Sequence, residues 1–195
     1  MSMLERCRER RRGAEEDEGF TLIELLVVLL IIGILLAIAI PTFLSVTKGA
    51  NGTAAQSNLQ TALTGGDTYF TDNNQSYSGI MTAGGSTSDL SQIDTGLTYL
   101  STSGAGVSKA TNQIGWETAA DFNSIAFWAY APGQDRCYAV VDVKATGSVP
   151  ASVTGLPTPT PTSTFYGWST PKTSGQCAIT DVATISNWAQ TGFPK

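Results

Sequence analysis

A continuous apolar segment near the N-terminus constrains the fold of this chain more than any other feature of its sequence. The sixteen residues Leu25–Ile40 carry no polar side chain. In a helix that rises about 1.5 Å per residue, Phe20–Ile40 spans about 30 Å, the thickness of the hydrocarbon core of a bilayer. We therefore predict a single membrane-spanning helix at residues 20–41.

Glu24 stands at the start of this apolar segment and indicates more than an anchor. A carboxylate inside a spanning helix costs at least a few kcal/mol, so it points to a functional site with a partner. If the chain were cut between Gly19 and Phe20, the new amine would lie about one helical turn before Glu24 and could neutralise it. The alternatives are a signal peptide cleaved at Ala37–Ala39, a plain single-span anchor and a buried core helix.

The first 19 residues hold five arginines and six acidic residues and have no hydrophobic face. On the other side of the apolar segment only Lys48 follows closely, so the positive-inside rule places the N-terminus in the cytoplasm. The whole chain carries a net charge of −5. No basic cluster follows Arg12, which excludes the electrostatic footprint of a protein that binds duplex nucleic acid.

The segment GFTLIELLVVLLIIGILLAIAIP, residues 19–41, resembles the N-terminal segment of type IV prepilins and the related pseudopilins. The shared pattern is a charged leader ending in Gly, then Phe, a Thr-Leu-Ile-Glu run, an apolar stretch and a Pro. In that family a prepilin peptidase cuts after the Gly and methylates the new N-terminal Phe. The resemblance implies that Gly19 is the cleavage-site residue, Phe20 the N-methylated residue and Glu24 the assembly glutamate. Many leaders of the family end in a basic residue, whereas acidic residues, Glu15–Glu18, precede Gly19 here.

Pairing of Glu24 with a neighbouring Phe20 amine would give apolar helices both attraction and register. Such helices gain little hydrophobic drive to associate in lipid, and a misregistered copy would leave a charge unpaired. Gly33 and Ala37 form a small-xxx-small pair that allows close approach. Gly33 lies about 180° from Glu24 around the helix, which suits a helix surrounded by neighbours. Ordinary membrane-helix composition explains Gly33 and Ala37 equally well.

Pro41 should kink the helix without ending it, because proline removes one backbone hydrogen bond. Beyond it, apolar residues recur at spacings of three and four, which predicts an amphipathic helix over residues 42–73. Glycines 49 and 52 weaken this helix by up to about 1 kcal/mol each relative to alanine. They favour local melting near Lys48–Thr53.

Residues 74–195 are predicted to form an extracellular, β-rich head. The glycine- and serine-rich stretch Asn73–Gly106 predicts a long surface loop with one strand near Leu97–Ser101. Pro132-Gly133 suits the centre of a type II turn and predicts a β-hairpin. Alternation in the second hairpin strand places Cys137, Ala139, Val141 and Val143 on one face. The strands are predicted at Ile114–Glu117, Ser124–Tyr130, Arg136–Lys144, Phe165–Ser169 and Gln176–Thr180.

Cys137 and Cys177 form an isolated downstream pair, as expected of a disulfide in an oxidising compartment. The bridge would close a loop of about 40 residues, contribute about 4 kcal/mol and pin the C-terminal segment to the sheet. Two buried free thiols are the alternative. In the pilin family a disulfide often delimits a C-terminal loop, and this pair lies where such a bridge would be.

The chain contains no histidine, which removes the commonest general base and zinc ligand. With no catalytic constellation or phosphate-binding loop, we expect no enzymatic activity, no cofactor and no small-molecule substrate. Asp135, Asp142 and Asp181 match no calcium-binding loop, so we interpret them as solvated surface residues and expect no bound metal.

The sequence therefore predicts an α+β, pilin-like fold, with a long N-terminal helix whose second half packs on an antiparallel sheet. The residues 1–19 are interpreted as a cytoplasmic leader peptide. The predicted function is a structural subunit that polymerises with copies of itself into an extracellular filament. Its expected partners are the membrane, the prepilin peptidase and the assembly ATPase and platform machinery. The alternatives are a type II secretion pseudopilin or minor pilin, and a membrane-anchored extracellular binding domain that does not polymerise.

Overall fold

The computed structural model describes residues 20–80, 89–100 and 106–194. The chain divides into two units, Met1–Leu44 and Ser45–Lys195. The predicted leader, with Gly19, lies outside the described residues. The elements in chain order are α2 (Leu22–Asp72), α3 (Asp89–Ile93), β1 (Thr98–Tyr99), β2 (Gln113–Thr118), β3 (Ser124–Ala131), β4 (Arg136–Val143), β5 (Ser163–Ser169) and α4 (Ile179–Val182).

The first unit contains the apolar half of helix α2. Every large hydrophobic side chain from Phe20 to Leu44 is at least 45% exposed in the single chain. Among the described residues, α2 is the one helix that is long and apolar enough to cross a membrane by length and composition. An exposed apolar surface of this size indicates a site that contacts a membrane or other protein molecules.

The second half of helix α2 is amphipathic, as predicted. Its buried residues follow one another at spacings of one to four and lie on one face: Gly52, Ala55, Leu59, Ala62, Leu63, Gly65 and Gly66. The helix is unbroken across Lys48–Thr53, where we predicted local melting. The turn between β3 and β4 supports this segment, because the Asn51 Nδ2 donates a hydrogen bond of 2.9 Å to the Pro132 carbonyl and Gly52 lies directly against the Gln134 side chain.

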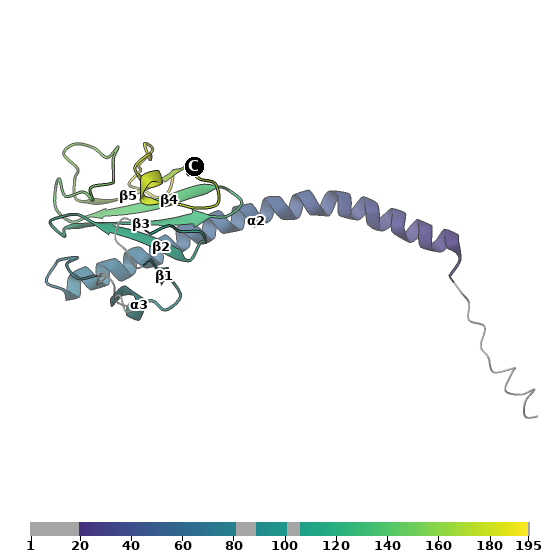
Figure 1. Ribbon diagram of the computed structural model, residues 1–195, viewed down its shortest axis with the longest axis horizontal. Helices are drawn as coiled ribbons and strands as arrows, with labels where there is room; N and C mark the ends of the chain where they lie inside the picture. The colour runs from purple at the N-terminus through teal and green to yellow at the C-terminus, as the bar shows by residue number, and fades with distance from the viewer. Residues whose placement is uncertain (1–19, 81–88, 101–105, 195) are drawn as a thin grey trace, which may run out of the picture. The chain divides into compact units, whose positions relative to one another are not determined.

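The sheet of the second unit has the order β1-β2-β3-β4-β5 (Figure 1). The short strand β1 pairs with β2 in parallel, and the other neighbours are antiparallel. Strands β3 and β4 form the predicted hairpin, in which Ala131 pairs with Arg136. Gly133 has a φ of +81°, the value that the third position of a type II turn requires.

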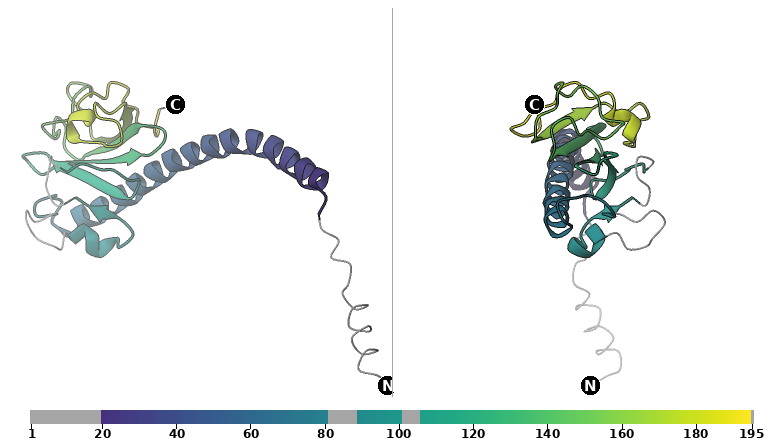
Figure 2. Two further views of the ribbon diagram at one scale, coloured as in Figure 1. Left: turned by 45° about the vertical axis from the view of Figure 1, so that its right-hand side comes forward. Right: turned by 90° about the vertical axis from the view of Figure 1, so that its left-hand side faces the viewer.

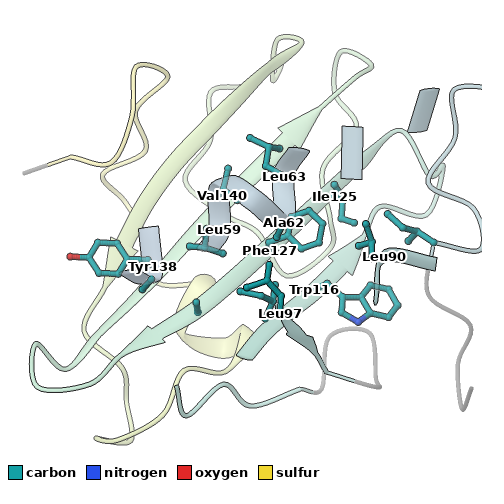
Figure 3. Close-up of a cluster of buried hydrophobic side chains, with 14 of the residues drawn as sticks. Leu59, Ala62, Leu63, Leu90, Leu97, Trp116, Ile125, Phe127, Tyr138 and Val140 are labelled. Carbon is teal, nitrogen blue, oxygen red and sulfur yellow. The ribbon is translucent and has the colours of Figure 1, made fainter. Parts of the chain in front are cut away.

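Helix α2 packs on one face of this sheet. In Figure 3 Leu59, Ala62 and Leu63 on the helix point toward Phe127 and Val140 on the strands. The core on this side is therefore built by one helical stripe, the alternate residues of β2, β3 and β4, and buried residues of the segment between α2 and β2.

The other face of the sheet is covered by the C-terminal segment, so both faces of β3 and β4 are buried. Figure 2 shows this yellow segment on the side of the sheet away from the helix. The four residues that alternation placed together, Cys137, Ala139, Val141 and Val143, all lie on this face, against Val182 and Ile185 of the C-terminal segment. The predicted α+β class is confirmed, with the sheet as the middle of three layers.

Two predictions for the head are wrong in part. Asn73–Gly106 is not simply a surface loop, because Tyr77, Ile80 and Leu90 are buried in the core and Leu90 belongs to helix α3. Gln176–Thr180 is not a strand, since only Cys177 forms an isolated bridge, to Ser108, before helix α4 begins. In both cases contacts with distant parts of the chain override weak local signals.

Candidate assembly site at the start of helix α2

Thr21 and Glu24 form a capping box at the start of helix α2. The Thr21 N–H and hydroxyl donate to Glu24 Oε2 at 2.9 and 2.7 Å, and the Glu24 N–H donates to Thr21 Oγ1 at 3.3 Å. In this arrangement the N-cap and N3 side chains satisfy backbone donors that the helix leaves unpaired. The negative charge of Glu24 also lies at the positive end of the helix dipole.

Phe20 directly precedes this cap and is 87% exposed. It lines a shallow, open groove along the helix start together with Ile23, Glu24, Val27 and Val28. The groove places a carboxylate beside an apolar surface, where attraction between opposite charges becomes stronger once water is excluded.

The remaining predicted assembly residues lie further along the same helix. Among the described residues, no atom outside the neighbouring residues and backbone of the same helix lies within 4 Å of where a Gly33 Cβ would stand, so its side of the helix is open. Ala37 precedes Pro41 by one helical turn, and Pro41 lies inside the helix. The Thr42 hydroxyl donates to the carbonyls of Ile38 and Ala39 at 2.7 and 3.0 Å.

A polar network joins helix α2 to the far end of strand β4. The Tyr77 hydroxyl donates to Asp142 Oδ2 at 2.5 Å, and Thr164 donates to Asp142 Oδ1 at 3.2 Å. Lys144 Nζ lies 2.9 Å from Asp142 and 2.6 Å from Asp67 on the helix. Burial raises the pKa of the Tyr77 phenol, and the charge of Asp142 adds to this shift. Burial alone would lower the pKa of Lys144, but its bonds to the two carboxylates outweigh burial and raise it.

The three aspartates considered for calcium do not meet. Asp142 belongs to the network above, and Asp181 accepts hydrogen bonds of 2.8 Å from the backbone N–H groups of Lys172 and Ala178. Asp142 and Asp181 are 3% and 2% exposed, so their interpretation as solvated surface residues is wrong. Among the described residues no group of three or more acidic or cysteine side chains is placed to hold a metal ion.

Cys137 and Cys177 form the predicted disulfide, with their Cα atoms 5.2 Å apart. Both residues are fully buried. Ser108 pairs with Cys177 through two backbone hydrogen bonds of 2.7 and 2.8 Å. The bridge therefore links the start of β4 to the segment that covers the second face of the sheet.

Two functional features were missed in the sequence. The role of Thr21 was predictable, because Thr-x-x-Glu directly before an apolar run is the signature of a capping box. The network of Tyr77, Asp142, Lys144 and Asp67 was not, since its members are up to 77 residues apart and share no local pattern.

Comparison with known proteins finds a family model and two curated relatives that match part of this chain. Residues 17–40 match a family model described as the prokaryotic N-terminal methylation motif. The type IV major pilin protein PilA of Myxococcus xanthus is 43% identical over 56 residues, which cover 29% of this chain and 26% of that protein. The type IV wide pilus major component PilA4 of Thermus thermophilus is 47% identical over 57 residues, which cover 29% of this chain and 44% of that protein.

The resemblance to type IV pilins that the sequence suggested is thereby confirmed. The chain spans less than half the length of either relative. No solved structure matches the chain.

Proposed function

We propose that this chain, whose N-terminal segment is that of type IV pilins, is a structural subunit of a type IV pilus-like filament. One observation carries the proposal: the described part of the methylation-motif segment leads into helix α2, and its large apolar side chains are exposed from Phe20 to Leu44. A bilayer covers that surface before assembly, and the same helices of neighbouring copies cover it in the fibre.

In this proposal Glu24 changes partners on assembly. In the single chain its carboxylate accepts two hydrogen bonds from Thr21. Cleavage after Gly19 would create a cationic amine on Phe20, and an amine of a neighbouring copy is a stronger partner for a carboxylate than a neutral hydroxyl. Each copy that enters in register then buries a neutral pair instead of a lone charge.

The small residues extend the same argument along the helix. The side of Gly33 is open in the single chain, so a neighbouring helix can approach closely there and at Ala37. Pro41 has no N–H to donate to Ala37, which leaves local freedom for the helix to bend as it packs.

The proposal also covers how the chain is processed and on which side of the membrane its parts lie. The prepilin peptidase cuts after Gly19 and methylates Phe20, and cytoplasmic ATPases drive extrusion from the membrane platform. The arginine-rich leader keeps the N-terminus in the cytoplasm. The head, which carries the Cys137–Cys177 disulfide, lies outside the cytoplasm, where oxidised cysteines persist.

The test is mass analysis of the protein sheared from the cell surface. We expect a chain that begins at residue 20 and carries one added methyl group on Phe20, whereas Gly19→Ala should keep its leader and yield no fibres. Full-length protein in the fibres would contradict the proposal. Full-length protein in the membrane, with no surface fibres, would instead favour a non-polymerising anchored domain.

The capping box allows the charge of Glu24 to be tested apart from its structural role. Glu24→Gln keeps a side chain that can complete the box but removes the charge, so we expect a stable membrane protein without fibres. Thr21→Val removes the cap but keeps the carboxylate, so we expect fibres from a helix start that is weaker by about 1 kcal/mol. Normal fibres from Glu24→Gln would show that charge pairing does not drive assembly.

A further inference from the structure

We propose that the two ends of the head carry opposite charges and bind each other between successive copies of this chain. The basic end, where β3 turns into β4, consists of Lys48, Lys109, Arg136 and Lys172. The acidic end, where β2 turns into β3, consists of Asp67, Asp72, Asp121 and Asp142. This inference rests on the proposed function, because it assumes that the chain polymerises.

Helix α2 and the hairpin strands place two cations at the basic end. The Lys48 side chain packs on Gly133 in the β3–β4 turn, with its Cγ 3.0 Å from where a Cβ of that glycine would stand. Arg136 is the first residue of β4, and its guanidinium lies 3.8 Å from the centre of the Trp168 ring on β5. Stacking on an aromatic face leaves the edge of a guanidinium free to meet a carboxylate.

Two further lysines reach the same end from other segments. Lys172 follows the end of β5, where Ser169 pairs with Cys137, and its side chain is exposed. Lys109 is exposed beside Ser108, whose hydroxyl accepts a hydrogen bond of 2.9 Å from the N–H of Tyr130 near the hairpin turn. In the described part of the chain, ion pairs involve Lys144 alone, so Lys109 and Lys172 have no ion-pair partner among the described residues.

Two carboxylates lie at the basic end but are already engaged. Asp135 accepts hydrogen bonds of 2.8 Å from the Tyr130 hydroxyl and 3.2 Å from the Gly175 N–H. Asp181 is 2% exposed and binds backbone N–H groups. The basic end therefore has four cationic side chains and two carboxylates, so its net charge is positive.

The acidic end has the reverse balance. Asp72 is the last residue of α2, and Asp121 lies in the β2–β3 connection; both are exposed. The segment that follows α2 and the β2–β3 connection lie side by side, since the Tyr77 N–H donates a hydrogen bond of 2.9 Å to the Phe122 carbonyl. Lys144 offsets part of the charge by pairing with Asp67 and Asp142, whereas no cation of the described chain pairs with Asp72 or Asp121. Within the described ranges, Asp121 accepts hydrogen bonds only from neutral donors, the Ser148 hydroxyl at 2.6 Å and the Asn123 N–H at 3.2 Å.

The two ends cannot neutralise each other within one head. The part of helix α2 from Lys48 to Asp72 is about 36 Å long at 1.5 Å per residue. This separation is several times the Debye length of about 8 Å at physiological ionic strength. In a fibre of parallel subunits, the basic end of one head faces along the axis toward the acidic end of another, and such a head-to-tail contact repeats without closing.

Charge complementarity favours a second copy over an anionic membrane as the occupant. A lipid surface would use the basic end alone and leave the acidic end without a role. Segments that bind anionic lipids typically gather about four to eight basic residues in one run. Here the four cations come from four separate segments, with two carboxylates among them.

Charge reversal in the full chain tests this contact, because fibres contain both ends of every subunit. Lys172→Glu and Asp72→Lys suit the test, since both side chains are exposed and neither makes an internal ion pair among the described residues. Each single change should lower the yield of sheared fibre about fivefold, the size expected when an exposed ion pair becomes a repulsion. The two changes in one chain should restore the yield, because the reversed ends again complement each other.

A matched control reverses two charges at one end. Lys109→Glu with Lys172→Glu should lower the yield further than Lys172→Glu alone, and rising salt should weaken unaltered fibres. A double change Lys172→Glu, Asp72→Lys that yields no more fibre than the single changes would overturn the contact while the proposed function stands. If Lys172→Glu is harmful and Asp72→Lys is harmless, the basic end serves a membrane instead and the inference fails. Absence of fibres from the unaltered chain would overturn the proposed function and this inference together.

Discussion

Replacing both Cys137 and Cys177 with alanine should lower the thermal midpoint of the head by roughly 10–15 °C. The disulfide joins residues 40 apart, and the chain-entropy relation gives about 4 kcal/mol for a loop of this size. A domain of about 150 residues changes its midpoint by about 2–4 °C for each kcal/mol. The covering segment should nevertheless fold, because Ser108 holds Cys177 by two backbone hydrogen bonds and Val182 and Ile185 remain buried.

The measurement is thermal unfolding of the purified, detergent-solubilised chain, followed by near-ultraviolet circular dichroism. The single variants Cys137→Ala and Cys177→Ala serve as matched controls. Either change breaks the same bridge, so each single variant should lose nearly as much stability as the double variant. Reductant should act on the unaltered protein only once it unfolds, because both cysteines are fully buried.

A double variant that unfolds within a few degrees of the unaltered protein would refute this reasoning. Packing of the C-terminal segment, and not the constraint on the unfolded chain, would then hold the second face of the sheet. Additive losses from the two single variants would also count against it, since they would reflect lost side-chain packing at each site.

Three further changes test the packing and electrostatics of the head. Gly115→Ala places a Cβ on the indole of Trp128 and should cost about 1–3 kcal/mol in a urea titration; an unchanged midpoint would mean that Trp128 moves freely. Tyr77 and Lys144 have raised pKa values in the folded head, so above about pH 10 they keep protons that the unfolded chain loses. The free energy of unfolding should therefore fall as the pH rises, by at most about 1.4 kcal/mol per pH unit for each group. Tyr77→Phe should make that fall shallower in titrations at pH values from neutral to alkaline, and an identical slope would exclude Tyr77 as a source. Asp181→Ala leaves two backbone N–H groups without their acceptor and should lower stability by about 1–3 kcal/mol per group, measured by the same titration.

Much of the architecture was predictable from short-range patterns. The apolar run and the three-and-four spacing after Pro41 predicted one long helix, and the helix extends over Leu22–Asp72. Alternation and Pro132-Gly133 predicted the β3–β4 hairpin and the faces of its strands. These predictions succeeded because helix period, strand period and turn chemistry depend on residues that are close in sequence.

The sequence by itself therefore determined the helix, the hairpin, the cysteine pair and the glutamate at the start of the apolar segment. Tertiary structure alone decided that Asp142 and Asp181 are buried, that Leu90 enters the core and that charges of opposite sign gather at the two ends of the head. Tyr77 reaches Asp142 across 65 residues of chain. Burial and charge balance are sums over neighbours in space, and local sequence patterns do not specify which distant segments become neighbours.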